Sequence, residues 1–264
     1  MKKKLVKKVV KKTTKKVVKK VAKKVVSKSK ISKKHIRVNT GIKNLDPLIS
    51  GGLIKDSVTL VTGGPGSGKT IFSMQYLMEG LKNGETCLYI TFEEKREKLY
   101  GDMLSFNWDF EKYEKKKQFF YLEYNPEQVK SLIEEGGGTV DQIITKRKVT
   151  RLVIDSVTSF SLLYQDELSK KEAALALFDL IDKWSCTAVL TAQAQSENQT
   201  NLDLDSLEFE VDSIIIIYHT KVKGKRIRGL EILKGRGTKH ANKTMGLVIN
   251  EHGLIVNPKE VLNI

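Results

Sequence analysis

The sequence predicts an α/β fold with a mostly parallel central sheet, helices on its faces and antiparallel hairpins toward the C-terminal end. Apolar segments of strand length alternate with segments of helical periodicity between residues 57 and 218. This alternation is typical of parallel strands joined by crossover helices. From Arg226 onward, short strand-like segments follow one another with turns between them. Such a succession indicates antiparallel strands added to a parallel sheet.

The alternating region begins with a β-branched segment at residues 57–62, which predicts a buried strand. Residues 71–81 then carry apolar side chains at helical spacing. A second apolar segment at residues 84–94 ends in two carboxylates, and a helix is expected after it at residues 95–105. Together these segments predict two successive strand–helix units.

The middle of the chain continues the same alternation. An aromatic segment at residues 119–122 predicts a short strand. A helix is expected to begin at Pro126, because proline is favoured in the first helical turn, and to reach residue 135. Glycines at 136–138 interrupt this helix before a second helical piece that ends near residue 146. Residues 151–156 predict another buried strand.

The last elements are an amphipathic helix at residues 168–184 and a strand at 186–191. A segment with four consecutive isoleucines, at residues 213–218, is apolar on both faces and predicts a central strand. The final hairpins end in strands expected at residues 244–250 and 253–257.

Charge divides the chain into a lysine-rich tail at residues 1–34 and a predicted folded domain at residues 35–264. The chain has 264 residues with 47 Lys and Arg, 31 Asp and Glu and a formal net charge of +16. The lysine-rich tail holds 17 lysines and no acid, which leaves 30 Lys and Arg against 31 Asp and Glu in the domain. The positive charge therefore belongs to the tail.

The lysine-rich tail alternates lysine pairs with valine or threonine pairs every four residues. This period gives neither a helix nor a strand a continuous apolar face, so we expect the tail to be disordered by itself. A disordered cationic segment can bind nucleic acid by releasing counterions, or an anionic membrane surface. It can also be a solvated extension, and the sequence leaves these alternatives open.

The composition argues against a membrane-spanning protein and a disulfide-stabilised one. No apolar segment approaches the roughly 18 residues that a spanning helix needs, and the N-terminus lacks the apolar core of a signal peptide. Cys87 and Cys186 lie in strand-like apolar segments, where we expect buried thiols. These features favour a cytoplasmic protein.

A glycine-rich loop lies between the first predicted strand and the first predicted helix. It fits the pattern G-x-x-x-x-G-K-[ST], in which glycines let backbone N–H groups approach a polyphosphate at a helix N-terminus. Lys69 is expected to reach the β- and γ-phosphates, and the Thr70 hydroxyl to bind Mg²⁺. The sequence therefore predicts a site for a nucleoside triphosphate and Mg²⁺ formed by Gly63, Gly64, Pro65, Gly66, Ser67, Gly68, Lys69 and Thr70.

Acidic side chains follow two of the predicted strands. Asp155 ends an apolar strand about 85 residues after the loop, where a carboxylate can face the Mg²⁺ bound by Thr70. Glu93 and Glu94 close the neighbouring strand, and one of them can deprotonate an attacking water. Because adjacent residues of a strand point to opposite faces, we expect only one of the two to face the phosphate. We favour Glu93 as this base and keep Glu94 as the second choice. Gln193, just past another strand, is expected to sense the γ-phosphate.

Cations concentrate between residues 221 and 239, with Glu231 as the one acid among them. Gly224 predicts a turn and therefore a basic hairpin. Lys234 and Arg236 then follow on a glycine-rich backbone, where cations can stabilise the charge of a transferring phosphate, often across a subunit boundary. Residues 196–205 are polar and are either a substrate-contacting loop or a simple connection.

The combination of motifs resembles the KaiC-like ATPases of the RecA superfamily, in the single-domain form frequent in archaea. The motifs that carry the resemblance occur in the expected order and span residues 36–257: Thr40-Gly41-Ile42, Leu45-Asp46, Gly51-Gly52-Leu53, the loop at 63–70, Gly84-Glu85, Tyr89 to Glu94, Leu152 to Ser156 and Lys234 to His240.

The resemblance implies a RecA-like core and a homo-oligomeric ring, usually a hexamer, with ATP between adjacent subunits. It also implies that Glu93 and Glu94 are the catalytic pair, that Asp155 lies beside Mg²⁺ and that Lys234 and Arg236 act on the neighbouring subunit's nucleotide. Clock KaiC has two tandem copies of the domain, whereas this chain has one, so a clock or autokinase role is not supported. Nothing is inherited for the lysine-rich tail.

Three functions remain open at this stage. The leading hypothesis is an ATP-hydrolysing regulatory ring that couples its nucleotide state to an unknown protein partner. A second is a non-catalytic ATP-binding switch similar to the accessory ATPase of the archaeal motility motor, against which the retained carboxylates argue. A third is a DNA-dependent recombination ATPase of the RadA type, which the cations favour and the lack of a separate DNA-binding domain disfavours.

Overall fold

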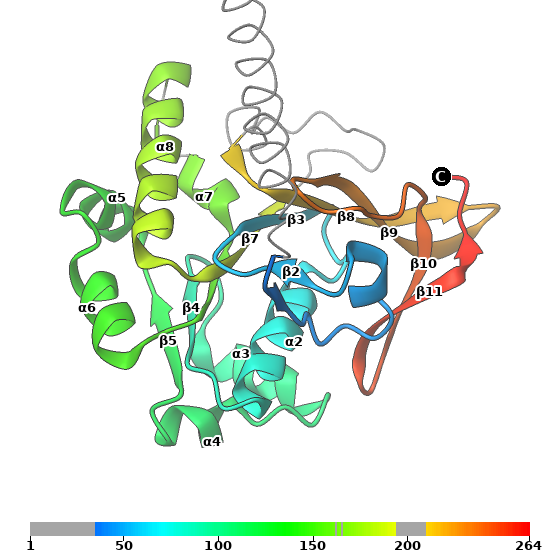
Figure 1. Cartoon of the computed structure of the whole chain (residues 1–264), viewed down its shortest axis with the longest axis horizontal. Coiled ribbons are helices and arrows are strands. Elements are labelled where there is room, and N and C mark those ends of the chain that lie inside the picture. The colour runs from blue at the N-terminus through cyan, green and yellow to red at the C-terminus, as the bar shows by residue number, and fades with distance from the viewer. Residues whose placement is uncertain (1–34, 162, 165, 194–209) are drawn as a thin grey trace, which may run out of the picture. The chain divides into compact units, whose positions relative to one another are not determined.

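The computed structural model describes residues 35–161, 163–164, 166–193 and 210–264, and Figure 1 shows the arrangement of their helices and strands. The lysine-rich tail and the polar segment at 196–205 lie outside the described residues. Within the described part of the chain, no helix is both long and apolar enough to cross a membrane.

The centre of the fold is a sheet to which nine strands contribute within the described residues. Their order is β11-β10-β9-β8-β3-β7-β6-β4-β5. The bounds are β3 (Val58–Gly63), β4 (Cys87–Thr91), β5 (Phe119–Glu123), β6 (Arg151–Asp155), β7 (Thr187–Gln193), β8 (Ser213–Val222), β9 (Lys225–Gly235), β10 (Met245–Asn250) and β11 (Gly253–Val261).

The sheet has a parallel part and an antiparallel part. Strands from β8 to β5 in the sheet order run parallel, with β3 between β7 and β8. Strands β9, β10 and β11 continue the sheet beyond β8 as antiparallel neighbours. The predicted fold class, a mostly parallel α/β sheet with antiparallel C-terminal hairpins, is confirmed.

Helices cover both faces of this sheet (Figure 1). Neighbouring residues of β3 show the division, because Leu60 packs in one apolar cluster with α6 and α8, whereas Val61 packs in another with α2 and α3. The helices are α2 (Lys69–Lys82), α3 (Arg96–Leu104), α4 (Phe110–Lys115), α5 (Pro126–Glu134), α6 (Gly138–Arg147), α7 (Val157–Ser161) and α8 (Glu167–Trp184).

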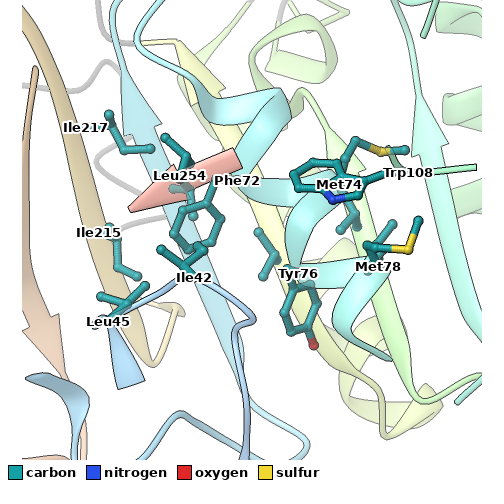
Figure 2. Close-up of a cluster of buried hydrophobic side chains, with 14 of the residues drawn as sticks. Ile42, Leu45, Phe72, Met74, Tyr76, Met78, Trp108, Ile215, Ile217 and Leu254 are labelled. Atoms are coloured by element: carbon teal, nitrogen blue, oxygen red, sulfur yellow. The ribbon is translucent and has the colours of Figure 1, made fainter. Parts of the chain in front are cut away.

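Helix α2, which begins directly after the glycine-rich loop, is deeply buried along most of its length. Phe72 and Tyr76 have no measurable exposure, and Phe72 lies near Ile215 and Leu254 from two distant strands (Figure 2). Burying aromatic side chains of this size contributes roughly 1.5–3 kcal/mol each. The N-terminal end of α2 is therefore fixed firmly relative to the sheet.

Most predicted elements are present, and the differences concern their ends. The strand expected at 84–94 ends at Thr91, and the strand expected at 213–218 continues to Val222 because it pairs along its whole length with β9. The sequence reading missed the short helices α4 and α7, a 3-10 turn η1 (Asp46–Ile49) and a small sheet of β1 (Arg37–Val38) and β2 (Leu53–Ile54). Elements this short have no periodicity that a sequence pattern could reveal.

Candidate functional site

The glycine-rich loop joins the carboxyl end of β3 to the first turn of α2. Gly68 adopts φ +114°, which side chains other than glycine rarely tolerate. A Cβ atom added at Gly63 would lie 2.2 Å from the carbonyl oxygen of Ile217 on β8. The loop therefore requires glycine for its turn and for its close approach to the neighbouring strand.

Lys69 extends from the start of α2 back over this loop. Its Nζ donates hydrogen bonds to the carbonyl oxygens of Gly63 and Gly64, at 2.8 and 3.1 Å. Burial lowers the pKa of Lys69, while the negative charges of Asp155 and Glu93 act in the opposite direction. The ammonium group thus lies near both carboxylates and is held by the loop's own backbone.

The Asp155 carboxylate at the end of β6 is buried and receives hydrogen bonds from three elements. Thr70 Oγ1 and Tyr89 OH donate to Oδ2 at 3.0 and 2.9 Å, and Thr191 Oγ1 donates to Oδ1 at 2.5 Å. Burial raises the pKa of the Tyr89 phenol, so this hydroxyl stays protonated and keeps its role as a donor. Asp155 is therefore fixed beside Thr70, as its predicted role requires.

Glu93 and Glu94 lie in the turn after β4 and not within the strand. Both backbone N–H groups donate to Thr91 Oγ1, at 3.3 and 3.2 Å. Strand alternation is therefore the wrong reason for expecting the two side chains to diverge. They diverge nonetheless, because the turn directs Glu93 and Glu94 toward different surroundings.

Glu93 faces the junction between β6 and α7, where its Oε1 accepts hydrogen bonds from Ser156 Oγ at 3.3 Å and from Ser159 Oγ. Glu94 forms an ion pair with Lys98 on the exposed side of α3, at 3.5 Å. Of the two acids, Glu93 is the one directed toward the neighbourhood of Lys69 and Asp155.

Gln193 is the last residue of β7 and pairs in register with Gly63. Its backbone N–H donates to Thr158 Oγ1 at 2.7 Å, and its side chain is exposed. Thr91 likewise pairs with Asp155. Because parallel strands end at one edge of the sheet, the loop, Glu93, Asp155 and Gln193 all lie along that edge.

Lys234 and Arg236 lie elsewhere on the sheet. Lys234 pairs with Ile214 of β8, which in turn pairs with Leu60, three residues before the carboxyl end of β3. Arg236 lies further away still, since its N–H donates to Asp212 O at 2.8 Å and its Nη1 to Glu210 O at 3.3 Å. The structure does not bring these two cations to the loop of their own chain.

Comparison with known proteins identifies relatives of this chain. A family model described as the KaiC ATPase matches residues 38–261. The chain belongs to the KaiC ATPase family. A UPF0273 protein of the archaeon Pyrococcus horikoshii is 33% identical over 239 residues, which cover 86% of this chain and 96% of that protein. The resemblance inferred from the motifs is thus confirmed.

Two further relatives differ in how much of their own length this chain covers. The crystal structure of a KaiC-like protein from Pyrococcus horikoshii has a TM-score of 0.76 and 31% identity, covering 85% of this chain and 100% of that one. The circadian clock protein KaiC3 of Synechocystis is 28% identical over 236 residues, 86% of this chain and 47% of that protein. This chain therefore spans about half the length of the clock protein.

Two residues beside the loop of this KaiC-family protein were not singled out from the sequence. Arg228 Nη2 donates to Gly66 O at 3.1 Å. His219 on β8 pairs in register with Arg228. A Cβ atom added at Gly66 would lie 3.6 Å from His219 Nδ1. The predicted turn at Gly224 is enough to pair residue 219 with residue 228, because residues equally far from the turn face each other. The sequence does not reveal that β8 lies beside β3, which is what brings both residues to the loop.

Proposed function

We propose that this protein binds ATP with Mg²⁺ and hydrolyses it. The observation that carries the proposal is the meeting of four groups from three separate segments at one sheet edge: the Lys69 ammonium and Thr70 hydroxyl at the start of α2, and the Asp155 and Glu93 carboxylates. Membership of a family of ATPases supports it. These are the groups that phosphoryl transfer needs for positioning and for charge stabilisation.

The residues present fit a nucleotide and its cation. Ser67 Oγ is buried without a hydrogen-bond partner inside the loop, and the loop backbone turns at the N-terminus of α2. In the proposal the loop residues 63–70 hold the triphosphate, and Thr70 and Asp155 hold Mg²⁺. The cation, when bound, neutralises charge on the phosphate oxygens.

Glu93 is proposed as the general base. Its carboxylate takes a proton from a water molecule whose oxygen forms a bond to the γ-phosphorus, while the bond between that phosphorus and the β–γ bridging oxygen breaks. The products are ADP and inorganic phosphate. Glu94, paired with Lys98, is the second candidate, and Gln193 is proposed to contact the γ-phosphate.

Lys234 and Arg236 are proposed to act across a subunit boundary, in a homo-oligomeric ring that is usually a hexamer in related proteins. Their location away from the chain's own loop supports a role in trans, since a head-to-tail ring brings a different surface of the neighbour to each loop. A regulatory function, in which the nucleotide state of the ring controls a protein partner, completes the proposal.

Steady-state hydrolysis of MgATP by the wild-type chain and by Glu93→Gln tests the proposal. We expect wild-type turnover and a loss of at least about a hundredfold in kcat for the variant, because general-base catalysis contributes about 10²–10⁴. Nucleotide affinity should be kept. Wild-type protein that binds ATP without hydrolysing it would instead favour the non-catalytic switch.

A nucleic-acid-dependent ATPase is the second candidate, favoured by the turn end of the β8–β9 hairpin. Lys221, Lys223, Lys225 and Arg226 are exposed there, and Arg228 on the same hairpin contacts Gly66. Cations in this number can bind a phosphate backbone. Stimulation of ATP turnover by single- or double-stranded DNA would favour this function over a purely regulatory one.

A further inference from the structure

Helix α7 begins two residues after Asp155, and hydroxyl groups in and just before it bind the turn after β4 and the end of β7. Ser159 Oγ donates to Glu93 Oε1, and Ser156 Oγ, just before the helix, donates to the same oxygen at 3.3 Å. Thr158 Oγ1 accepts the backbone N–H of Gln193 at 2.7 Å. The helix is therefore fixed to β7 on one side and holds the Glu93 carboxylate on the other.

A general base must be held at hydrogen-bonding distance from the proton that it removes. A glutamate in a turn after a strand has several rotatable bonds, and nothing in the backbone of residues 92–95 fixes its carboxylate. The two serine hydroxyls supply that restraint. Because both bind Oε1, they orient the carboxylate from one side and leave Oε2 to accept a proton from water.

We propose that Ser159, assisted by Ser156, is a positioning residue for Glu93. The proposal rests on the proposed function, in which Glu93 is the base. Ser159 does not touch the nucleotide; it acts by keeping the Glu93 side chain in one orientation. The bond from Gln193 to Thr158 keeps α7, and hence the Ser159 hydroxyl, at a fixed place relative to the sheet edge.

The test compares three variants of the full chain. Ser159→Ala removes the donor, and Ser159→Thr keeps a hydroxyl at the same position. Ser169→Ala is the matched control, since Ser169 Oγ also donates to a carboxylate, Asp166 Oδ2 at 2.7 Å, but at the start of α8. For each variant kcat and KM for MgATP are measured, together with the melting temperature.

We expect Ser159→Ala to lower kcat about tenfold with KM unchanged, because a misplaced catalytic group costs rate and not substrate binding. Ser159→Thr should stay within about twofold of wild type, and Ser169→Ala should match wild type. Ser156→Ala provides a second measurement if Ser159→Ala fails to fold, with a smaller loss in kcat and the same unchanged KM.

Two results would overturn the positioning role. One is a kcat for Ser159→Ala equal to that of Ser169→Ala. The other is an equal loss in Ser159→Ala and Ser159→Thr with a raised KM, which indicates a structural effect. The proposed function is tested separately. If Glu93→Gln keeps its turnover, Glu93 is not the base. If Glu93→Gln is inactive while Ser159→Ala is fully active, only the positioning role is refuted.

Discussion

At the scale of single residues, the candidate site depends on short-range hydrogen bonds that fix charged groups. Asp155 is held by three hydroxyls, and Lys69 is held by two carbonyl oxygens of its own loop. Such bonds to ionised groups contribute roughly 1.5–3 kcal/mol each when they are made, and leaving a charge without them costs more. These bonds fix the Asp155 carboxylate and the Lys69 ammonium relative to the loop.

Arg228 gives a prediction at this scale. Arg228→Ala should weaken nucleotide affinity about tenfold, because its guanidinium donates to Gly66 O in the loop that is proposed to hold the triphosphate, and its positive charge is lost with the side chain. Arg226→Ala, on the same hairpin with its Nη1 on His219 O, is the control and should bind normally. Titration with a fluorescent ATP analogue measures both, and equal affinities for the two variants would contradict the assignment.

At the scale of elements, one partly buried ion pair, between Arg151 and Glu85, connects β6 to its surroundings. Arg151, at the start of β6, is 1% exposed and donates to Glu85, to Asn39 O and to Tyr76 O, with its guanidinium 4.7 Å from the Tyr76 ring centre. It thereby joins the segment around Asn39, helix α2 and the residues just before β4 to the strand that carries Asp155.

This ion pair predicts a pH dependence of stability. Burial by itself would raise the pKa of Glu85, but the hydrogen bonds and charge of Arg151 outweigh burial and lower the pKa below its ordinary 4.5. A lowered pKa in the folded state stabilises the protein above pH 4.5, and this contribution is lost as the pH falls through the folded-state pKa.

Glu85→Gln should therefore melt at a lower temperature than wild type at neutral pH, and the difference should shrink as the pH falls from about 5 to about 3. Glu111→Gln, which removes an exposed pair with Lys115, is the control and should show little difference at either pH. A constant difference for Glu85→Gln across this range would show that the ion pair is not its cause.

The elements also show how far the sequence could predict the site. The sequence could predict that the loop, Lys69, Thr70 and Asp155 lie together, because each follows a local pattern, a glycine motif or a strand that ends in an acid. Arg228 and Ser159 were not found, since their importance depends on which strands are neighbours in the sheet. The divergence of Glu93 and Glu94 was expected, but from strand alternation and not from the turn that produces it.

At the scale of the whole molecule, the positive charge of the chain is concentrated in the lysine-rich tail. We propose that the lysine-rich tail binds nucleic acid independently of the ATPase domain at residues 35–264. Deleting residues 1–34 should weaken DNA binding and flatten its dependence on salt, because each lysine–phosphate contact releases counterions. Fluorescence anisotropy at several salt concentrations measures the affinity for DNA. If the affinity and its dependence on salt are unchanged by the deletion, this role is excluded.

In the proposed function ATP is hydrolysed between subunits, with Glu93 from one subunit and Arg236 from its neighbour. Glu93→Gln and Arg236→Ala chains, each inactive alone, can be co-expressed so that mixed rings form. In a head-to-tail ring of random composition, about a quarter of the interfaces combine an intact Glu93 with an intact Arg236. If ATP is hydrolysed between subunits, these rings should recover about a quarter of wild-type ATP turnover. Turnover in mixed rings no higher than the mean of the two variants would contradict it.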